Sequence, residues 1–297
     1  MARRRLAGQR ALVTGASSGI GRALALRLAA EGADLVVTAR REERLRELAA
    51  EVEGAHGVAV SVEAIDLGAP GAAADLYART EGAGVAVDVL VNNAGFGDYE
   101  QFVASPWERL SAMMTLNMTA LTELTHRFAP RMVERGRGRV LNVASIAAFL
   151  PNPNFAVYAA TKAYVRNLSE ALDAELRPAG VRCMVLCPGG TRTEFLETAG
   201  QRERAGAGAV MMSAERCADI GVRAMLAGRR TVVPGWLNAT GMSLLRLVPR
   251  ALMPWVAAVS VGSAVAQIER PALPGPPGDD QVPSRDGGGD ERDPSAD

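Results

Sequence analysis

The sequence contains few aromatic residues and few cysteines. Aromatic side chains make up 4% of the chain, against 48% for all hydrophobic residues, so aliphatic side chains must fill the core. The three cysteines, Cys183, Cys187 and Cys217, do not have the spacing of metal ligands, and the sequence indicates no metal site. Because Cys183 and Cys187 lie on one predicted strand, a disulfide between them is disfavoured. We therefore expect buried thiols and a cytoplasmic protein.

An excess of charge and a leader segment are also missing. The formal net charge is +0, which removes the global electrostatic reason to bind nucleic acid, and we expect no such partner. The basic run at the N-terminus is interrupted by Gly8, Gln9 and Arg10 before any apolar stretch, so we expect no signal peptide. We interpret residues 1–8 as a solvated basic tail, with contact to anionic lipid as the alternative.

Short apolar runs alternate with amphipathic helical stretches along most of the chain. This alternation is typical of parallel βαβ units, which right-handed crossovers wind into one sheet covered on both faces. The expected strands cover residues 11–15, 34–39, 58–67, 87–91, 139–144, 181–186 and 231–233. The expected helices cover residues 19–30, 41–52, 70–80, 107–133, 157–176 and 213–226. The sequence predicts an α/β fold, a doubly wound parallel seven-stranded sheet (Rossmann fold) in a single domain over residues 9–235.

The segment after this domain is unusually apolar. Residues 236–268 are expected to form an apolar helical extension, but two arginines and two prolines interrupt them, so a spanning helix is disfavoured. The extension can be an oligomer interface or a lid over an apolar substrate, or it can lie in a membrane interface with its tryptophans and arginines at headgroup depth. Residues 269–297 are rich in Pro, Gly, Asp and Ser, which predicts a disordered tail.

A glycine-rich turn joins the first predicted strand to the first predicted helix. Gly15, Gly19 and Gly21 let the backbone approach a pyrophosphate closely, and the following helix offers free N–H groups to the anion. Ser17, Ser18 and Ile20 lie within the same turn. The position of the turn favours dinucleotide binding, and a structural turn without a ligand is the alternative.

The end of the second predicted strand bears on which dinucleotide binds. A carboxylate here would bind the ribose 2′-OH of NAD(H), whereas arginine would accommodate the 2′-phosphate of NADP(H). The sequence has Arg40 and Arg41 and no acid between residues 38 and 41. We therefore expect NADP(H) to be preferred over NAD(H). The alternative is that the two arginines only begin a solvated helix.

Two further strand ends carry polar or small residues. Asp66 closes the third predicted strand and could accept a hydrogen bond from an adenine amine, although it could equally be a turn residue. Asn93, Ala94 and Gly95 follow the fourth strand, where small residues would let a ribose lie against the backbone. Ligands bind at this carboxyl edge of open parallel sheets.

Four polar residues form a candidate reaction centre. Tyr158 and Lys162 lie four apart on a predicted helix and therefore share a face. An ammonium beside a phenol favours phenolate, so Lys162 is expected to lower the pKa of Tyr158 toward neutrality. Ser145 follows the fifth strand and could hydrogen-bond a reacting oxygen, while Asn117 could hold a water or Lys162 in a proton relay. Taken singly, each residue could instead be ordinary helix surface or turn.

In combination, these motifs resemble those of the short-chain dehydrogenase/reductase family. The matching segments are residues 14–21 (TGASSGIG), 92–95 (NNAG), 117, 145, 158–162 (YAATK) and 188–189 (PG), all in family order. The resemblance implies Tyr158 as catalytic acid/base, and Lys162 as both modulator of its pKa and ligand of the nicotinamide ribose. It also implies Ser145 as stabiliser of the substrate oxygen and Asn117 as relay residue.

The resemblance further implies how the cofactor is held. The implied contacts come from Ser17, Ile20, Arg40, Asp66, Leu67, Asn93, Thr191 and Thr193, the last two after Pro188 and Gly189. Such a protein would be an NADP(H)-dependent oxidoreductase acting on a carbonyl or secondary alcohol, and usually a homodimer or homotetramer.

Substrate choice is expected to depend on residues that follow the fourth, fifth and sixth strands, although such apolar residues could equally be ordinary core. The candidates are Phe96, Ala147, Phe155, Gly190 and Phe195, and they suggest a small-molecule substrate of apolar or lipid-like character. A glycine-containing segment from Phe195 to residue 212 suits a mobile lid. A non-catalytic NADP-binding sensor and a membrane-interface scaffold on the same fold are the alternatives, although a sensor would not need Ser145, Tyr158 and Lys162.

Overall fold

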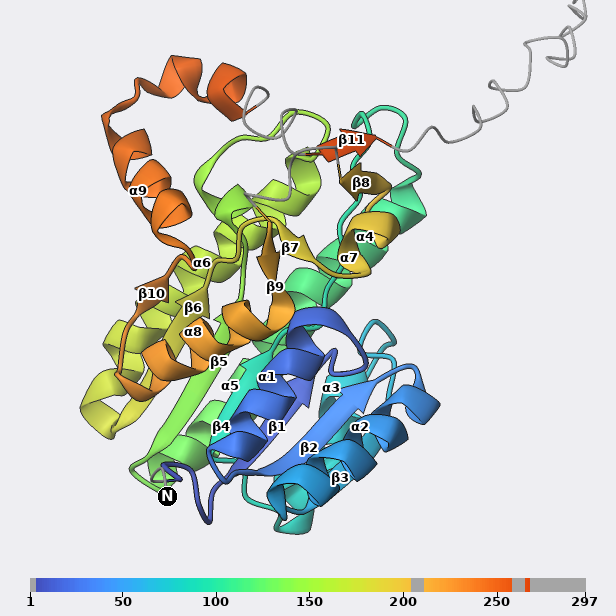
Figure 1. The fold of residues 1–297 in the computed structure, drawn as a ribbon, viewed down its shortest axis with the longest axis vertical. Helices are drawn as coiled ribbons and strands as arrows, with labels where there is room; N and C mark the ends of the chain where they lie inside the picture. Colours follow the sequence, from blue (N-terminus) through green and yellow to red (C-terminus); the bar gives the residue numbers. More distant parts are fainter. Residues whose placement is uncertain (1–3, 204–210, 258–264, 268–297) are drawn as a thin grey trace, which may run out of the picture.

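Seven parallel strands form the central sheet of the computed structural model, which describes residues 4–203, 211–257 and 265–267 (Figure 1). Their order is β10-β6-β5-β4-β1-β2-β3, and every neighbouring pair is parallel. The strands are β1 (Arg10–Thr14), β2 (Asp34–Ala39), β3 (Val60–Ala64), β4 (Val89–Asn92), β5 (Gly138–Val143), β6 (Val181–Leu186) and β10 (Thr231–Val232). The predicted seven-stranded doubly wound sheet is therefore confirmed.

Helices cover both faces of this sheet. Those with at least one full turn are α1 (Gly19–Ala30), α2 (Glu42–His56), α3 (Ala72–Arg79), α4 (Trp107–Met114), α5 (Leu121–Glu134), α6 (Ala156–Leu176), α7 (Phe195–Thr198), α8 (Ala214–Leu226) and α9 (Trp236–Leu244). Alternate residues of β1 point to opposite faces: Val13 packs with α1, α2 and α8, whereas Leu12 packs with α3 and α5. This alternation produces two core layers of mainly aliphatic side chains.

The predicted element boundaries differ from the structure where apolar residues pack outside regular strands. The third strand is Val60–Ala64, shorter than the predicted 58–67, because Val58, Ile65 and Leu67 are buried as loop residues on either side of it. The predicted helix over residues 107–133 is divided into α4, a π-helical segment η2 (Thr115–Ala120) and α5. Apolar periodicity in the sequence does not distinguish a buried loop residue from a strand residue, or a π-helical segment from an α-helix.

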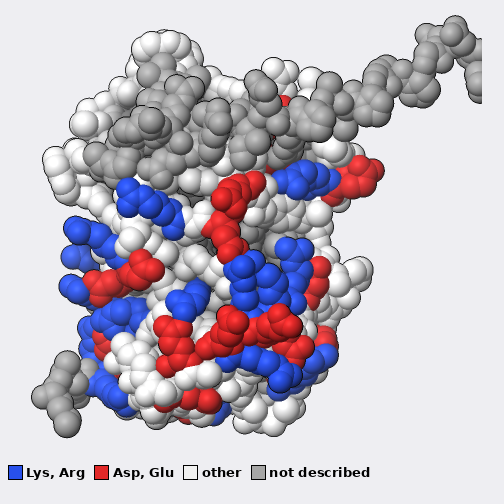
Figure 2. All heavy atoms as spheres, turned by 45° about the vertical axis from the view of Figure 1, so that its right-hand side comes forward, with Lys and Arg blue, Asp and Glu red and all other residues white. Residues whose placement is uncertain are grey.

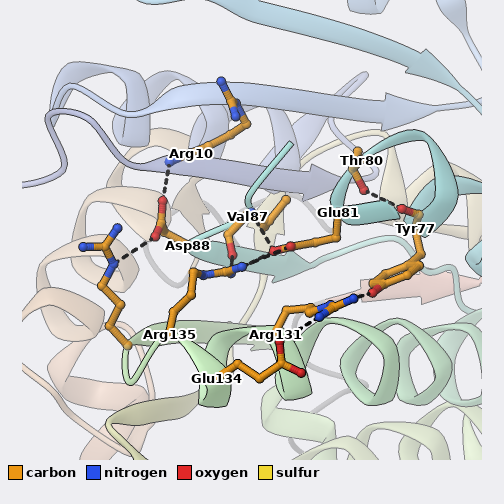
Figure 3. A network of polar contacts seen from close by, with 10 residues as sticks. Arg10, Tyr77, Thr80, Glu81, Val87, Asp88, Arg131, Glu134 and Arg135 are labelled. Atoms are coloured by element: carbon orange, nitrogen blue, oxygen red, sulfur yellow. Dashed lines mark hydrogen bonds and ion pairs between the residues drawn. The ribbon is translucent and has the colours of Figure 1, made fainter. Parts of the chain in front are cut away.

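A polar network ties together the amino ends of the central strands, opposite the edge where the glycine turn lies (Figure 3). The Asp88 carboxylate accepts a hydrogen bond from the Arg10 backbone N–H at 3.1 Å and pairs with Arg137 at 3.4 Å. Arg135 donates to Glu81 at 2.8 Å and to the Val87 carbonyl at 2.7 Å. These contacts hold the loops before β4 and β5 in place. Because the polar groups at this edge bind one another, we expect a ligand site at the opposite, carboxyl edge of the sheet.

The N-terminal segment departs from the prediction of a solvated tail. Leu6 is fully buried in the first core layer, and Arg5 pairs with Glu31 of the α1 C-cap at 2.9 Å. The expectation is therefore wrong for residues 4–8, because one apolar side chain and one ion pair hold them against the domain. The predicted disordered tail, residues 269–297, lies outside the described residues.

The expectation of buried thiols is confirmed. Cys183, Cys187 and Cys217 are all buried and unpaired. Burial raises the pKa of each thiol to about 12, so none is a reactive thiolate at neutral pH.

The first part of the extension after β10 lies apart from the sheet, with α9 at the upper left of Figure 1, whereas β11 (Val265–Gln267) lies beside β8 (Gln201–Glu203). The extension consists of α9, the short helical turns η6 (Leu245–Leu247) and η7 (Arg250–Leu252), and β11, which pairs with β8. Trp236 and Trp255 are 76% and 69% exposed. Among the described residues, no helix is both long and apolar enough to cross a membrane.

Acidic and basic side chains are interleaved over the lower part of the surface in Figure 2, in keeping with the net charge of zero. Many of them form ion pairs one helical turn apart, such as Arg46 with Glu42 and Arg79 with Asp75. Exposed pairs of this kind contribute little stability.

Asp173 differs from these exposed pairs, because its carboxylate is buried and fixes the C-terminal end of α6. The side chain of Asp173 is fully buried and accepts hydrogen bonds from Arg177, from Arg182 at 2.9 Å and from Arg230 at 3.1 Å. The Cys183 backbone N–H donates to it as well, at 3.2 Å. Burial raises the pKa of Asp173, but the arginines outweigh burial and hold the pKa below its usual value.

We predict that Asp173→Asn lowers the free energy of unfolding by about 2 kcal/mol, because three guanidinium groups lose their charged partner. The stabilisation should be present above the unfolded pKa of 3.8 and be lost as the pH falls below it. Denaturant unfolding at pH 7 measures the change. Asp75→Asn, which breaks an exposed pair on α3, is the matched control and should cost under about 0.5 kcal/mol. Equal stability of the two variants would contradict the prediction.

Candidate active site

A cavity of about 790 Å³ lies along the carboxyl edge of the sheet. Its lining includes most of the predicted site residues: Gly15, Ser17, Ser18, Gly19, Ile20, Arg40, Arg41, Asp66, Leu67, Asn93, Ala94, Gly95, Phe96, Ser145, Ala147, Phe155, Tyr158, Lys162, Pro188, Gly189, Gly190, Thr191, Thr193 and Phe195. Gly21 and Asn117 are the predicted residues that do not line it. The fold thus gathers motifs from the whole domain into one crevice.

The glycine turn between β1 and α1 is shaped for close backbone approach. Gly15 and Gly19 have φ values of +66° and +55°, which only glycine adopts without strain. A Cβ on Gly21 would lie 2.2 Å from the Gly15 carbonyl oxygen, so this glycine packs the helix against the turn. Ser18 is the N-cap of α1, and its side chain makes no capping hydrogen bond. The first N–H groups of α1 are therefore without a side-chain acceptor at the cavity wall.

Thr14 and Asn93 hold this turn in place through hydrogen bonds. The Thr14 hydroxyl accepts the backbone N–H groups of Asn93 at 2.9 Å and Ala94 at 3.0 Å, and it donates to the Val91 carbonyl. The Asn93 amide donates to the carbonyls of Thr14 and Gly15, at 3.0 and 3.2 Å. Thr14 is a site residue that we did not single out from the sequence, although it begins the glycine motif.

Tyr158 and Lys162 lie on one face of α6, each with only 5% of its surface exposed. Ser145 lines the same cavity as Tyr158 and acts to lower the pKa of the phenol, and it is the N-cap of a short helical turn, η3 (Ile146–Phe149). The Lys162 ammonium donates to the Val143 carbonyl at the end of β5, at 2.9 Å, and lies 5.7 Å from the centre of the Tyr158 ring. The predicted acid/base pair and Ser145 are therefore brought together.

The direction of the Tyr158 pKa differs from the expectation. Burial raises the pKa of Tyr158, and the hydrogen bond from Ser145 offsets only part of this. Burial also lowers the pKa of Lys162 to about 8. Lys162 does not lower the pKa of Tyr158 toward neutrality, because both side chains are buried and the ammonium donates its hydrogen bond to the Val143 carbonyl. The phenol is thus protonated at neutral pH and can donate its proton.

Asn117 lies behind the cavity, in the π-helical segment η2. Its amide donates to the Phe96 carbonyl at 2.9 Å and to the Thr161 hydroxyl at 3.1 Å, and its oxygen accepts the Phe96 N–H at 3.1 Å. A Cβ on Gly95 would lie 2.7 Å from the Asn117 oxygen and 3.5 Å from the Lys162 nitrogen. Asn117 therefore fixes the loop after β4, beside Lys162. Its role in a proton relay stays a prediction.

The arginines after β2 face the glycine turn from α2. Arg41 donates to the hydroxyls of Ser17 at 3.2 Å and Ser18 at 2.9 Å, while Arg40 is exposed at the cavity wall. Arg41 also pairs with Glu194 at 2.8 Å, a residue that we did not predict because nothing in its local sequence marks it.

Asp66 is exposed at the wall of the cavity, just after β3. Its carboxylate accepts the Gly68 N–H at 3.0 Å, as in an ordinary Asx turn. This contact is what the turn interpretation predicts, and the adenine contact stays a prediction.

Aromatic rings cover the reactive end of the cavity. The Phe155 ring stacks on Tyr158 with centres 4.2 Å apart, and the centre of the Phe195 ring lies 5.4 Å from that of Tyr158. Within the predicted lid, residues 204–210 lie outside the described residues, but α7 is described and Arg109 donates to its Thr198 carbonyl at 2.7 Å. Leu237 and Met242 of α9 complete the lining. The substrate end of the cavity is predominantly apolar.

Comparisons with known proteins agree with this geometry. The sequence profile of the short chain dehydrogenase family matches residues 9–204. A very-long-chain 3-oxoacyl-CoA reductase of Laccaria bicolor is 39% identical over 172 residues, which are 57% of this chain and 51% of the relative. The aligned part therefore spans about half the length of that relative.

Solved structures match over a larger share of the chain. A short-chain dehydrogenase from Sphingobium yanoikuyae in complex with NADPH is 33% identical with a TM-score of 0.72, covering 82% of this chain and 97% of the other. A 7β-hydroxysteroid dehydrogenase structure is 26% identical with a TM-score of 0.78, covering 86% and 99%.

We predict that Lys162 titrates near pH 8. It is the only lysine in the sequence, so ¹⁵N-lysine labelling should give a single side-chain amine signal. NMR titration of the cofactor-free chain should place its midpoint at about 8, because burial disfavours the ammonium. A Lys162→Met variant, which should lack the signal, is the control. A midpoint near the ordinary value of 10.5 would show that the amine is solvated.

Proposed function

The chain belongs to the short chain dehydrogenase family, and we propose that it is an NADP(H)-dependent oxidoreductase that interconverts a carbonyl and a secondary alcohol. The observation that carries this proposal is that Tyr158, Ser145 and Lys162 meet at the wall of one crevice, with Tyr158 and Lys162 buried one turn apart on α6. A phenol and a hydroxyl that converge on one point can bind the same substrate oxygen.

The residues of the crevice suit a dinucleotide. The glycine turn, the uncapped first turn of α1 and the small residues after β4 form a surface against which a pyrophosphate and two riboses can lie. Thr191 and Thr193 follow β6, and a Cβ on Gly19 would lie 3.0 Å from the Thr193 side chain. When bound, the nicotinamide supplies or accepts the hydride.

Each polar residue then has a defined task. Tyr158, protonated at neutral pH because it is buried, gives its proton to the carbonyl oxygen in reduction and takes it back in oxidation. Ser145 donates a hydrogen bond to the same oxygen and stabilises negative charge there. Lys162 holds the nicotinamide ribose and returns a proton toward Tyr158, while Asn117 keeps the adjoining strand end in place.

Preference for NADP(H) is supported by the charges at the end of β2. Arg40 and Arg41 line the cavity with the glycine turn, Arg44 pairs with Glu194 of the same cavity, and guanidinium groups suit a phosphate. The NADPH in the Sphingobium yanoikuyae relative agrees with this assignment.

The substrate is proposed to be apolar or lipid-like. The rings of Phe155 and Phe195 flank Tyr158, and Met211, Leu237 and Met242 continue the apolar lining. The relatives named for 3-oxoacyl-CoA and hydroxysteroid substrates act on molecules of this character.

The outer surface of the C-terminal extension is proposed to rest on an anionic bilayer, with the inner side of α9 as a wall of the substrate cavity. Trp236, Leu247 and Trp255 are 76%, 81% and 69% exposed. Residues 236–257 contain two arginines and no acidic residue. Exposed tryptophans in a segment that has arginines and no acidic residue suit headgroup depth. A contact between two copies of the chain, as homodimer or homotetramer, is the competing use of the same surface.

We predict that Tyr158→Phe keeps NADPH affinity within about twofold but lowers turnover by about 10²- to 10⁴-fold, because only the proton donor is lost. NADPH oxidation with a panel of bulky ketones measures turnover, and fluorescence titration measures binding. Tyr164→Phe is the matched control, since Tyr164 lies on the same helix but bonds Thr122 at the surface. If Tyr158→Phe turned over like the unaltered chain, the catalytic assignment would be wrong. Retained binding without any turnover by the unaltered chain would favour the sensor.

We predict that the full chain co-sediments with phosphatidylcholine vesicles containing phosphatidylglycerol, and less with phosphatidylcholine alone. Changing Trp236 and Trp255 together to Ser should remove most of this binding. Trp107→Ser is the matched control, because Trp107 is 65% exposed at the start of α4. Absence of sedimentation, together with a lower oligomer mass of the double variant in light scattering, would instead assign the surface to contact between copies.

A further inference from the structure

An acidic side chain lies among the arginines that face the glycine turn. The Glu194 carboxylate pairs with Arg41 at 2.8 Å through one oxygen and with Arg44 through the other. These arginines belong to the α2 end of the crevice, whereas Glu194 precedes α7 at the opposite wall, 153 and 150 residues further along the chain. The hydrogen bonds from Arg44 and Arg41 hold the pKa of Glu194 below its usual value, so the group is ionised at neutral pH.

The donors around this carboxylate form an anion site. Arg41 donates both to Glu194 and to the hydroxyls of Ser17 and Ser18 in the glycine turn. Ser17, Ser18, Arg41 and Glu194 line the same cavity, and Arg44 joins them through its ion pair with Glu194. Two guanidinium groups and two hydroxyls suit a phosphate better than a single carboxylate, because a phosphate ester has about two negative charges and three acceptor oxygens. Glu194 thus occupies the place where a 2′-phosphate would find its donors.

The same residue controls the position of α7. Glu194 is the N-cap of α7, and its carbonyl accepts the Thr198 hydroxyl at 3.0 Å. The next residue, Phe195, holds its ring 5.4 Å from that of Tyr158. The ion pairs of Glu194 therefore fasten the element that places an aromatic ring beside the reaction centre.

We propose that Glu194 is a specificity-determining residue: its carboxylate holds the arginine pair in the free chain, and a 2′-phosphate displaces it and releases α7. This inference rests on the proposed dinucleotide binding. Arg41, Arg44 and Glu194 are 43–45% exposed, so the two ion pairs are individually weak and a doubly charged phosphate can replace them. A dinucleotide with a 2′-hydroxyl lacks the charge to do so and leaves Phe195 against Tyr158.

The test compares Glu194→Gln with Glu197→Gln in the full chain. Glu197 lies on α7 and is exposed, so its variant makes the same charge change without touching the arginines. Calorimetric titration with NADPH, NADH, adenosine 2′,5′-bisphosphate and 5′-AMP gives the affinities. We expect Glu194→Gln to bind NADPH and the bisphosphate about three- to tenfold more tightly, with NADH and 5′-AMP changed less than about twofold. Glu197→Gln should match the unaltered chain for all four.

Hydrogen exchange of the peptide that contains α7 provides a second measurement. NADPH should speed exchange there in the unaltered chain, NADH should not, and Glu194→Gln should exchange fast without any ligand. Unchanged NADPH affinity in Glu194→Gln would overturn the inference. A loss of NADH affinity in that variant would also overturn it, because the carboxylate would then hold a ribose hydroxyl. Failure of every form to bind either dinucleotide would instead remove the proposed function on which the inference rests.

Discussion

The burial of Tyr158 and Lys162 on one face of α6 is the constraint on which the rest of the site depends. Both side chains are almost fully buried, so their protonation is set by desolvation and by the few groups that touch them. Lys162 is held by the last carbonyl of β5, and the far end of the helix is held by the buried Asp173. A helix fixed at two points against the sheet presents a phenol at a constant place and in a protonated state.

The crevice has two ends with different physical character. At the α2 end, arginines and serine hydroxyls surround a carboxylate, and the interactions are charged and partly exposed. At the other end, the aromatic rings of Phe155 and Phe195 lie within 5.4 Å of the Tyr158 ring and the surroundings are apolar. The segment from Glu194 to Thr198 contacts both ends, since its first residue meets the arginines and its second meets the tyrosine. The same short segment therefore contacts both the charged end and the aromatic end of the crevice.

Much of the fold and most of the site were predictable because each signal lies within one element or one turn. The parallel sheet follows from apolar runs that alternate with helical stretches, and α1, β2 and β6 have the predicted bounds. Gly15, Gly19 and Gly21 are marked by the turn that only glycine can make, and the pair on α6 by its four-residue spacing. The prediction of an acidic Tyr158 was wrong, because spacing brings an ammonium near a phenol but does not reveal how far both are desolvated.

The sequence by itself determined the order of the strands along the chain, the glycine turn and the acid/base pair, since backbone geometry and local periodicity decide these over a few residues. Only the tertiary structure decided that Leu6 packs into the core, that Asn117 braces Phe96 and Thr161, and that Glu194 meets Arg41. These contacts join segments separated by up to 153 residues, and no local pattern encodes which distant side chain will arrive. The contact between Glu194 and Arg41 forms because segments that follow different parallel strands meet at one edge, where the carboxyl ends of the strands open on the same side.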